Sequence, residues 1–253
     1  MFEEERKQRI LDYLNKYSRG SVQELSQETG VSESTIRRDL KELEEANLLK
    51  RTHGGAISLQ SVRFEAPYQD KEDHLLEEKE RIARKAAAMI QEGDAILLDS
   101  GTTTLQIAKE IKHFSNIKVI TNSLMVLNEL KNNRGIELSI AGGMLRPDTL
   151  AFVGPMTEQS LNMVRVDKAF LAINGLDLQE GLTTPNIVEA STKRKMINIA
   201  KQVILVADHS KLGHVYYSRV ADLSEMDHLI TDSSIPDNFR QKLLQLDLDV
   251  TFA

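Results

Sequence analysis

The chain has 253 residues, no cysteine and a formal net charge of −6, with 41% hydrophobic and 28% charged residues. This composition is typical of a globular protein long enough for two domains, and the lack of cysteine excludes disulfides and thiolate metal sites. The first residues, Met1 to Glu5, are acidic where a signal peptide is basic, and no apolar run approaches the ~20 residues that span a membrane, so we expect a cytoplasmic protein with no membrane partner.

Three helices are predicted at the start of the chain. Residues 3–15 form an amphipathic helix, and residues 22–29 a shorter one behind the N-cap candidate Ser21. Gly30 supplies a turn, and a third helix begins near Glu33 behind the N-cap Ser32. At about 100° per residue the apolar and the polar, cationic side chains of this third helix fall on opposite arcs; the apolar ones are Ile36, Leu40 and Leu43.

This arrangement predicts a helix-turn-helix whose second helix lies in the major groove of double-stranded DNA. The alternative is an ordinary helical hairpin with solvated charges, but the cap, the turn and the neighbouring segments favour DNA binding. Residues 1–58 carry a net charge of only −1, so the DNA contact must come from a local cationic face. The candidate DNA-binding residues of this helix are Ser32, Ser34, Thr35, Arg37, Arg38 and Lys41.

A β-hairpin is predicted after the third helix, which Asn47 ends by adopting a left-handed conformation. Two short strand-like runs, 48–52 and 56–59, surround His53-Gly54-Gly55. The predicted hairpin corresponds in position to the wing of a winged-helix domain. Arg51 and His53 are candidates for phosphate or minor-groove contacts, with plain solvent exposure as the alternative.

These residues carry a resemblance to a known family. The run from Val31 to Leu40, followed by Leu43-Glu44, Lys50-Arg51 and His53-Gly54-Gly55-Ala56, resembles the N-terminal signature of the DeoR family of bacterial transcriptional regulators. Asn47 stands where the family usually has glycine. The resemblance implies a winged helix-turn-helix DNA-binding domain over residues 3–58.

Beyond this domain the polar residues 59–75, which contain Pro67, are predicted to be a linker. A helix is expected from 77 to 91, with Ile82, Ala86 and Ile90 facing inward together with Met89, and Gly93 after its end. From there short apolar runs alternate with helical stretches, which predicts a doubly wound, mostly parallel α/β domain over 76–253. The expected strands are 95–98, 118–120, 136–141, 168–173, 203–207 and 228–230.

Polar and glycine residues follow these runs, at the carboxyl ends of the strands where open α/β sheets bind ligands. The stretch 100–103 offers backbone N–H groups, hydroxyls and a helix N-terminus to an anion such as phosphate, although it is neither a Walker loop nor a GxGxxG fingerprint. We expect Lys193 or Lys211 to supply charge, and carboxylates and an amide to bind sugar hydroxyls. The candidate effector-binding residues are Asp99, Ser100, Gly101, Thr102, Thr103, Asn122, Gly142, Gly143, Glu189, Lys193, Asp208 and Lys211.

Each of these residues also has a purely structural interpretation. Asp99, Ser100 or Thr103 would cap a helix, Gly142-Gly143 would form a turn, and Glu189 with Lys193 would be a surface pair at i,i+4 spacing. The six histidines show no metal-ligand spacing, and neither a metal nor a cofactor is expected.

The second half of the chain also resembles the sensor domain of the DeoR family. The resemblance implies a fold similar to ribose-5-phosphate isomerase, glucosamine-6-phosphate deaminase and the CoA transferases, and a phosphorylated sugar or related metabolite as effector. Ala172 stands where the family commonly has glycine, and His209 stands where it commonly has a small residue. The matching stretches are 98–103, 119–123, 142–143, 153–154, 167–170, 181–184, 189–193, 207–211 and 230–232.

The leading hypothesis is therefore a transcriptional repressor of a sugar-metabolism operon, which binds operator DNA as a homo-oligomer, a dimer or a tetramer, and responds to a sugar phosphate. One alternative is a sugar-phosphate isomerase or deaminase with an accessory DNA-binding domain, using Asp99, Glu189 and Asp208 as acid and base. The sequence shows no separate catalytic motif for it. A third hypothesis, a constitutive architectural DNA-binding protein, predicts DNA affinity that no metabolite alters.

Overall fold

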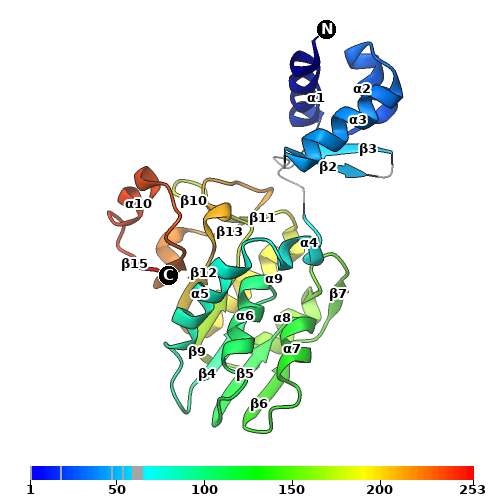
Figure 1. Ribbon diagram of the computed structural model, residues 1–253. Helices are drawn as coiled ribbons and strands as arrows, with labels where there is room; N and C mark the ends of the chain where they lie inside the picture. Colours follow the sequence, from blue (N-terminus) through cyan, green and yellow to red (C-terminus); the bar gives the residue numbers. More distant parts are fainter. Residues whose placement is uncertain (1, 18, 47, 53, 59–64) are drawn as a thin grey trace. The chain divides into compact units, whose positions relative to one another are not determined.

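The computed structural model describes residues 2–17, 19–46, 48–52, 54–58 and 65–253. The chain divides into two compact units, residues 1–64 and residues 65–253 (Figure 1). Within the described ranges, no helix is both long enough and apolar enough to cross a membrane.

The first unit contains the three predicted helices and the predicted hairpin. The helices are α1 (Glu3–Tyr17), α2 (Val22–Thr29) and α3 (Glu33–Glu45), and the hairpin strands are β2 (Leu49–Thr52) and β3 (Gly55–Ser58). A third strand, β1 (Arg19–Ser21), pairs antiparallel with β3 and was not predicted. A Cβ on Gly55 would lie 2.0 Å from the carbonyl oxygen of Gly20, so this pairing requires a glycine where the two backbones meet.

The predicted caps and turn are confirmed. Ser21 forms a reciprocal capping box with Glu24, and the Ser32 hydroxyl accepts a hydrogen bond from the backbone N–H of Thr35 at 3.4 Å. Gly30 has a φ of 70°, in the left-handed region, where glycine is favoured because it has no Cβ. Asn47 lies outside the described residues. Side chains of all three helices and the sheet form one apolar core, which includes Ile10, Leu14, Leu25, Ile36 and Leu40.

The second unit is built on a seven-stranded sheet in which every strand pair is parallel, which confirms the predicted doubly wound class (Figure 1). The order is β15-β14-β12-β9-β4-β5-β6. The chain builds outward from β4 through β5 to β6, then returns to place β9 on the other side of β4. The switch point of the sheet therefore lies between β4 and β9. The strands are β4 (Ala95–Leu98), β5 (Ile117–Thr121), β6 (Ile136–Ile140), β9 (Val166–Leu171), β12 (Ala200–Val206), β14 (His228–Thr231) and β15 (Asp249–Phe252).

The strands are apolar throughout because both faces of the sheet are covered. In β4, Ile96 and Leu98 pack into one core and Leu97 packs into the other, as expected for side chains that alternate along a strand. The first core includes side chains of α5 (Leu76–Ala87), α6 (Thr102–Glu110) and α7 (Leu124–Leu130). The second includes side chains of α8 (Pro155–Asn162), α9 (Ile187–Ile199) and α10 (Asp237–Leu243).

Antiparallel strands that the sequence did not predict are attached to this framework. One pair is β7 (Met144–Arg146) with β8 (Ala151–Val153), and a three-stranded sheet combines β10 (Gly175–Asp177), β11 (Gly181–Thr184) and β13 (Ser218–Ala221). Two short 3-10 turns cover His209–Lys211 and Leu223–Glu225. These strands have three or four residues, too few for an alternating pattern to stand out.

The predicted linker 59–75 needs correction. Residues 59–64 lie outside the described residues, but 65–75 belong to the second unit and contain the short helix α4 (Tyr68–Glu72). Tyr68 is 3% exposed, and its backbone N–H donates to the carbonyl of Asp148 at 2.7 Å. A five-residue helix with one buried side chain leaves no periodicity to detect.

The helix expected over 77–91 is also shorter than predicted. It ends at Ala87, and Met89 and Ile90 donate to carbonyls three residues back, which tightens the chain into turns. Gly93, with a φ of 89°, then allows the chain to enter β4.

Candidate functional site

The outer face of α3 carries the predicted DNA-binding side chains. Ser32, Ser34, Arg37, Arg38 and Lys41 are exposed, and Thr35 is half-buried. Arg37 lies 3.4 Å from Glu33, and Lys41 lies 3.8 Å from Glu45. Exposed pairs of this kind contribute about 0–1 kcal/mol, so DNA phosphates can compete for both cations.

The inner face of α3 contains a charged residue that sequence analysis did not assign to the core. Asp39 is fully buried and receives two hydrogen bonds from the Arg6 guanidinium of α1, at 2.5 Å and 3.0 Å. The hydrogen bond to Asp39 raises the pKa of Arg6 although burial opposes this. The pair fixes α1 against α3 and so sets the orientation of the proposed recognition helix.

The hairpin is joined to α3 by a second charged contact. Arg51 is exposed, and Glu44 of α3 accepts hydrogen bonds from its backbone N–H at 2.8 Å and from its Nε at 2.7 Å. His53, the other hairpin candidate, lies outside the described residues.

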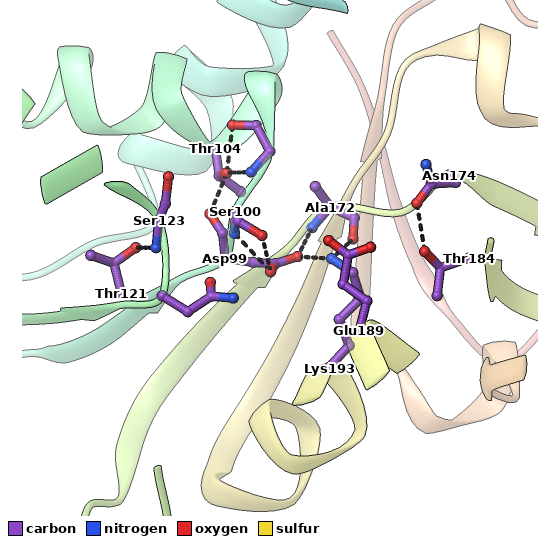
Figure 2. Close-up of polar contacts among 12 residues, drawn as sticks. Asp99, Ser100, Thr104, Thr121, Ser123, Ala172, Asn174, Thr184, Glu189 and Lys193 are labelled. Carbon is purple, nitrogen blue, oxygen red and sulfur yellow. Dashed lines mark hydrogen bonds and ion pairs between the residues drawn. The ribbon is translucent and has the colours of Figure 1, made fainter. Parts of the chain in front are cut away.

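At the switch point of the second unit, Asp99 after β4 forms a buried ion pair with Lys193 of α9, and both side chains bond to the backbone of Ala172 after β9 (Figure 2). Asp99, at the end of β4, is fully buried and accepts hydrogen bonds from the backbone N–H of Ser100 at 2.7 Å and of Ala172 at 3.1 Å. Lys193 of α9 donates to the Asp99 carboxylate and, at 2.9 Å, to the carbonyl of Ala172. Burial lowers the pKa of Lys193, but the charges of Asp99 and Glu189 outweigh burial and leave the pKa raised.

The surface-pair interpretation of Glu189 and Lys193 is therefore wrong. Both are 4% exposed, and each bonds to another partner: Lys193 to Asp99, and Glu189 to Arg146 of β7 at 2.5 Å. Burial and the nearby charge of Glu65 raise the pKa of Glu189 against the opposing effect of Lys193 and Arg146. Sequence analysis missed Arg146 and Glu65, because neither stands in a recognisable motif.

The N-terminus of α6 begins directly after Asp99 and Ser100. Its N-cap is Gly101, which has no side-chain acceptor, so the helix keeps backbone N–H groups for an anion. Thr104 closes the turn by accepting from the Gly101 N–H at 2.9 Å. The prediction that Asp99, Ser100 or Thr103 caps this helix is wrong, since Asp99 instead bonds across to β9. Thr102 and Thr103, the first two residues of the helix, are buried.

The ends of β4 and β9 also approach each other through small residues. A Cβ on Gly101 would lie 2.5 Å from the Cβ of Ala172. A larger residue at either position would therefore force the two strand ends apart, so Ala172 narrows the space beside the α6 N-terminus.

Further candidates follow the next two strands. Asn122 is 1% exposed and donates to the carbonyl of Phe152 at 3.0 Å, while its Oδ1 has no hydrogen-bond partner among the described residues. Gly142 accepts from the Thr157 hydroxyl at 3.3 Å, and a Cβ on Gly143 would lie 2.2 Å from that hydroxyl oxygen. The Gly142-Gly143 pair thus permits a close approach between the β6 end and α8.

The last group follows β12. Asp208 is fully buried and accepts from the Ser210 N–H at 3.0 Å, and its Oδ2 has no partner within the described chain. Lys211 Nζ lies 3.0 Å from the Ser210 hydroxyl and 4.0 Å from Asp208 Oδ1. Burial lowers the pKa of Lys211. His209 Nδ1 lies 2.8 Å from Asp232 Oδ2, at the end of the adjacent β14.

Both units of the chain match models of known protein families. The DeoR-like helix-turn-helix domain matches residues 6–62, and the DeoR C terminal sensor domain matches residues 75–233. The chain belongs to the DeoR family of transcriptional regulators. The predicted family is confirmed, and with it a DNA-binding regulator made of a helix-turn-helix domain and a sensor domain.

Similar DeoR-family proteins align over nearly the whole chain. The transcriptional regulator GlpR of Haloferax volcanii is 41% identical over 96% of this chain and 95% of its own. The glycerol-3-phosphate regulon repressor of Escherichia coli is 36% identical over 94% of this chain and 96% of its own. Among solved structures, ribose 5-phosphate isomerase A of Methanocaldococcus jannaschii has a TM-score of 0.39 and 17% identity over 53% of both chains. That likeness is too low to transfer chemistry.

Proposed function

We propose that this DeoR-family protein is a repressor of a carbohydrate-metabolism operon and that a phosphorylated sugar bound to the second unit controls its affinity for DNA. The observation that carries the proposal is the polar cluster at the switch point between β4 and β9, beside a helix N-terminus capped by glycine. A relative at 36% identity is named as a glycerol-3-phosphate regulon repressor, which supports both the repressor role and a phosphorylated effector.

The proposed site combines an anion subsite with hydroxyl-binding groups. The phosphate lies at the α6 N-terminus, where Ser100 and Thr102 add hydroxyls, and Lys211 supplies a cation. Lys193 does not have this role in the proposal, because its ammonium is already bonded to Asp99 and Ala172.

Two acceptor atoms in the second unit suit the hydroxyls of a sugar. Asn122 Oδ1 and Asp208 Oδ2 are buried and have no partner within the described chain, although buried polar atoms are nearly always hydrogen-bonded. A polyhydroxylated ligand would supply the missing donors.

The response requires a ligand that distinguishes two arrangements of the protein. In the proposed mechanism, a homo-oligomer places two copies of α3 on repeated half-sites of the operator. The sugar phosphate binds the arrangement with low affinity for DNA more tightly, because only differential affinity shifts such an equilibrium.

We further propose that Asp99 and Glu189 do not act as a catalytic acid and base. Of the three carboxylates that an isomerase or deaminase would use as acid and base, Asp99 is bound by Lys193 and two backbone N–H groups, and Glu189 by Arg146. Both are engaged in structural contacts, and neither is free to exchange a proton with a substrate.

The test is a thermal-shift screen of the full-length protein against sugar phosphates, their parent sugars and inorganic phosphate. A ligand that binds the folded state raises the melting temperature by mass action. We expect at least one sugar phosphate to raise it where the parent sugar does not, and Lys211→Gln to reduce that shift. Lys201→Gln, which removes an exposed cation from β12, is the matched control. If no sugar phosphate shifts the melting temperature, the proposed effector class is wrong, while DNA binding by α3 remains to be judged separately.

A further inference from the structure

Glu65, the first residue of the second unit, has a buried carboxylate that is only half satisfied. Its side chain is 7% exposed. Oε1 accepts hydrogen bonds from Lys71 Nζ at 2.7 Å and from Asn174 Nδ2 at 2.8 Å. Oε2 is buried and has no hydrogen-bond partner among the described residues. Buried carboxylate oxygens normally accept a hydrogen bond. Oε2 therefore has room for a donor, and the described chain does not supply one.

The contacts of Glu65 place it at the proposed effector site. Asn174 follows β9 two residues after Ala172, and its Oδ1 accepts from the Thr184 hydroxyl at 2.8 Å (Figure 2). The charge of Glu65 is also close enough to Glu189 and Lys193 to raise the pKa of both. In Figure 2 Asn174 is labelled on the same side of Asp99 as Ala172 and Glu189.

A second unpartnered atom lies in the same segment. Tyr68 is 3% exposed, and its hydroxyl has no partner within the described chain. The backbone of Tyr68 is fixed by its bond to Asp148, and Glu65 is fixed by Asn174, so two points hold the segment on the second unit.

We propose that Glu65 is an effector-binding residue whose Oε2 accepts a hydrogen bond from a hydroxyl of a polyhydroxylated ligand. This inference rests on the proposed sugar-phosphate function and names the group that recognises the sugar rather than the phosphate. A negatively charged carboxylate repels inorganic phosphate and attracts a hydroxyl donor, so Glu65 selects ligands by their hydroxyl groups.

The position of Glu65 in the chain gives this contact a second consequence. Glu65 begins the unit that follows the DNA-binding unit. A ligand that bonds to its carboxylate adds a third contact to this residue, beside those from Lys71 and Asn174.

The experiment compares the full-length protein with Glu65→Gln and with Asp73→Asn. Asp73 is an exposed carboxylate in the same segment and serves as the matched control. Dissociation constants are measured by calorimetry for ribose 5-phosphate, glucose 6-phosphate, fructose 1-phosphate, glycerol 3-phosphate and inorganic phosphate. The readout is the preference for the best sugar phosphate over inorganic phosphate. Because this is a ratio, a general loss of stability does not alter it.

We expect Glu65→Gln to reduce this preference about tenfold, the usual effect of losing one hydrogen bond to a charged group. Asp73→Asn leaves the preference unchanged. At saturating sugar phosphate, hydrogen exchange in peptides covering residues 65–79 slows in the wild type and not in Glu65→Gln. Glu65→Asp, which withdraws the carboxylate by one methylene, is measured if Glu65→Gln does not fold.

Two results would overturn the inference while leaving the proposed function intact. One is an unchanged preference in Glu65→Gln. The other is an equal weakening of sugar phosphates and inorganic phosphate, which would show that Glu65 only supports the site. If no sugar phosphate binds the wild type at all, the proposed function fails first, and the inference fails with it.

Discussion

The buried pair between Lys193 and Asp99 gives a prediction that separates a structural role from a ligand-binding one. Replacing Lys193 with methionine keeps most of the side-chain volume but removes the ammonium that bonds to Asp99 and to the Ala172 carbonyl. Asp99, which is fully buried, then keeps only the N–H groups of Ser100 and Ala172 and the long contact to the Ser100 hydroxyl at 3.4 Å. Removing one partner of a buried ion pair typically costs about 3–5 kcal/mol.

That cost is large enough to measure. For a domain of 150–250 residues each kcal/mol lowers the melting temperature by about 2–4 °C, so Lys193→Met should lower it by roughly 6–20 °C. The assay is thermal unfolding of the full-length protein without ligand, followed by a signal from the second unit. Lys201→Met, which breaks an exposed pair with Asp167, is the control and should change stability by less than about 0.5 kcal/mol.

A double-mutant cycle tests the cause. Asp99→Asn combined with Lys193→Met removes both charges of the pair, and with them the unpaired buried charge that either single variant leaves at this position. The double variant should therefore lose less stability than the sum of the single variants, by about 0.5–3 kcal/mol. Strict additivity, or a fall of less than about 2 °C in Lys193→Met, would refute the argument that this pair joins β4 to β9.

Three further predictions concern other parts of the molecule. Arg37→Ala should weaken operator binding by about 1–3 kcal/mol in an electrophoretic mobility-shift assay and leave the melting temperature unchanged, because the side chain is exposed; an equal loss of stability would place it in the core. Asp39→Ala should destabilise the first unit by about 3–5 kcal/mol by leaving Arg6 buried and unpaired, seen as an early unfolding transition separate from the second unit. Burial raises the pKa of Asp232, but hydrogen bonds from His209 and Ser234 outweigh it and hold the pKa below the usual range of an aspartate. The resulting stabilisation is present above the pKa of an unfolded aspartate and is lost as the pH falls through the lowered pKa, so the melting-temperature difference between wild type and Asp232→Asn should shrink in acid.

The sequence by itself determined the local structure of the DNA-binding unit. Ser32 caps α3 and Gly30 turns the chain because of side-chain and backbone properties that act within a few residues. The spacing of Ile36 and Leu40 decides which face of α3 packs, and therefore which face carries Arg37. In the second unit the apolar runs such as Ala95–Leu98 predicted the parallel sheet, since strands covered on both faces are apolar at every position.

Only the tertiary structure decided which polar residues meet. An i,i+4 spacing of Glu189 and Lys193 is the same for a surface pair as for a buried one. Because α9 packs beside the switch point, Lys193 bonds to Asp99, 94 residues away in the chain. Glu189 bonds to Arg146, 43 residues away. The same order of strands brings Glu65 to Asn174, 109 residues later, although the segment around Glu65 has no period that would indicate a fold. Contacts at such separations depend on strand order, and strand order depends on how the whole sheet packs rather than on any local pattern.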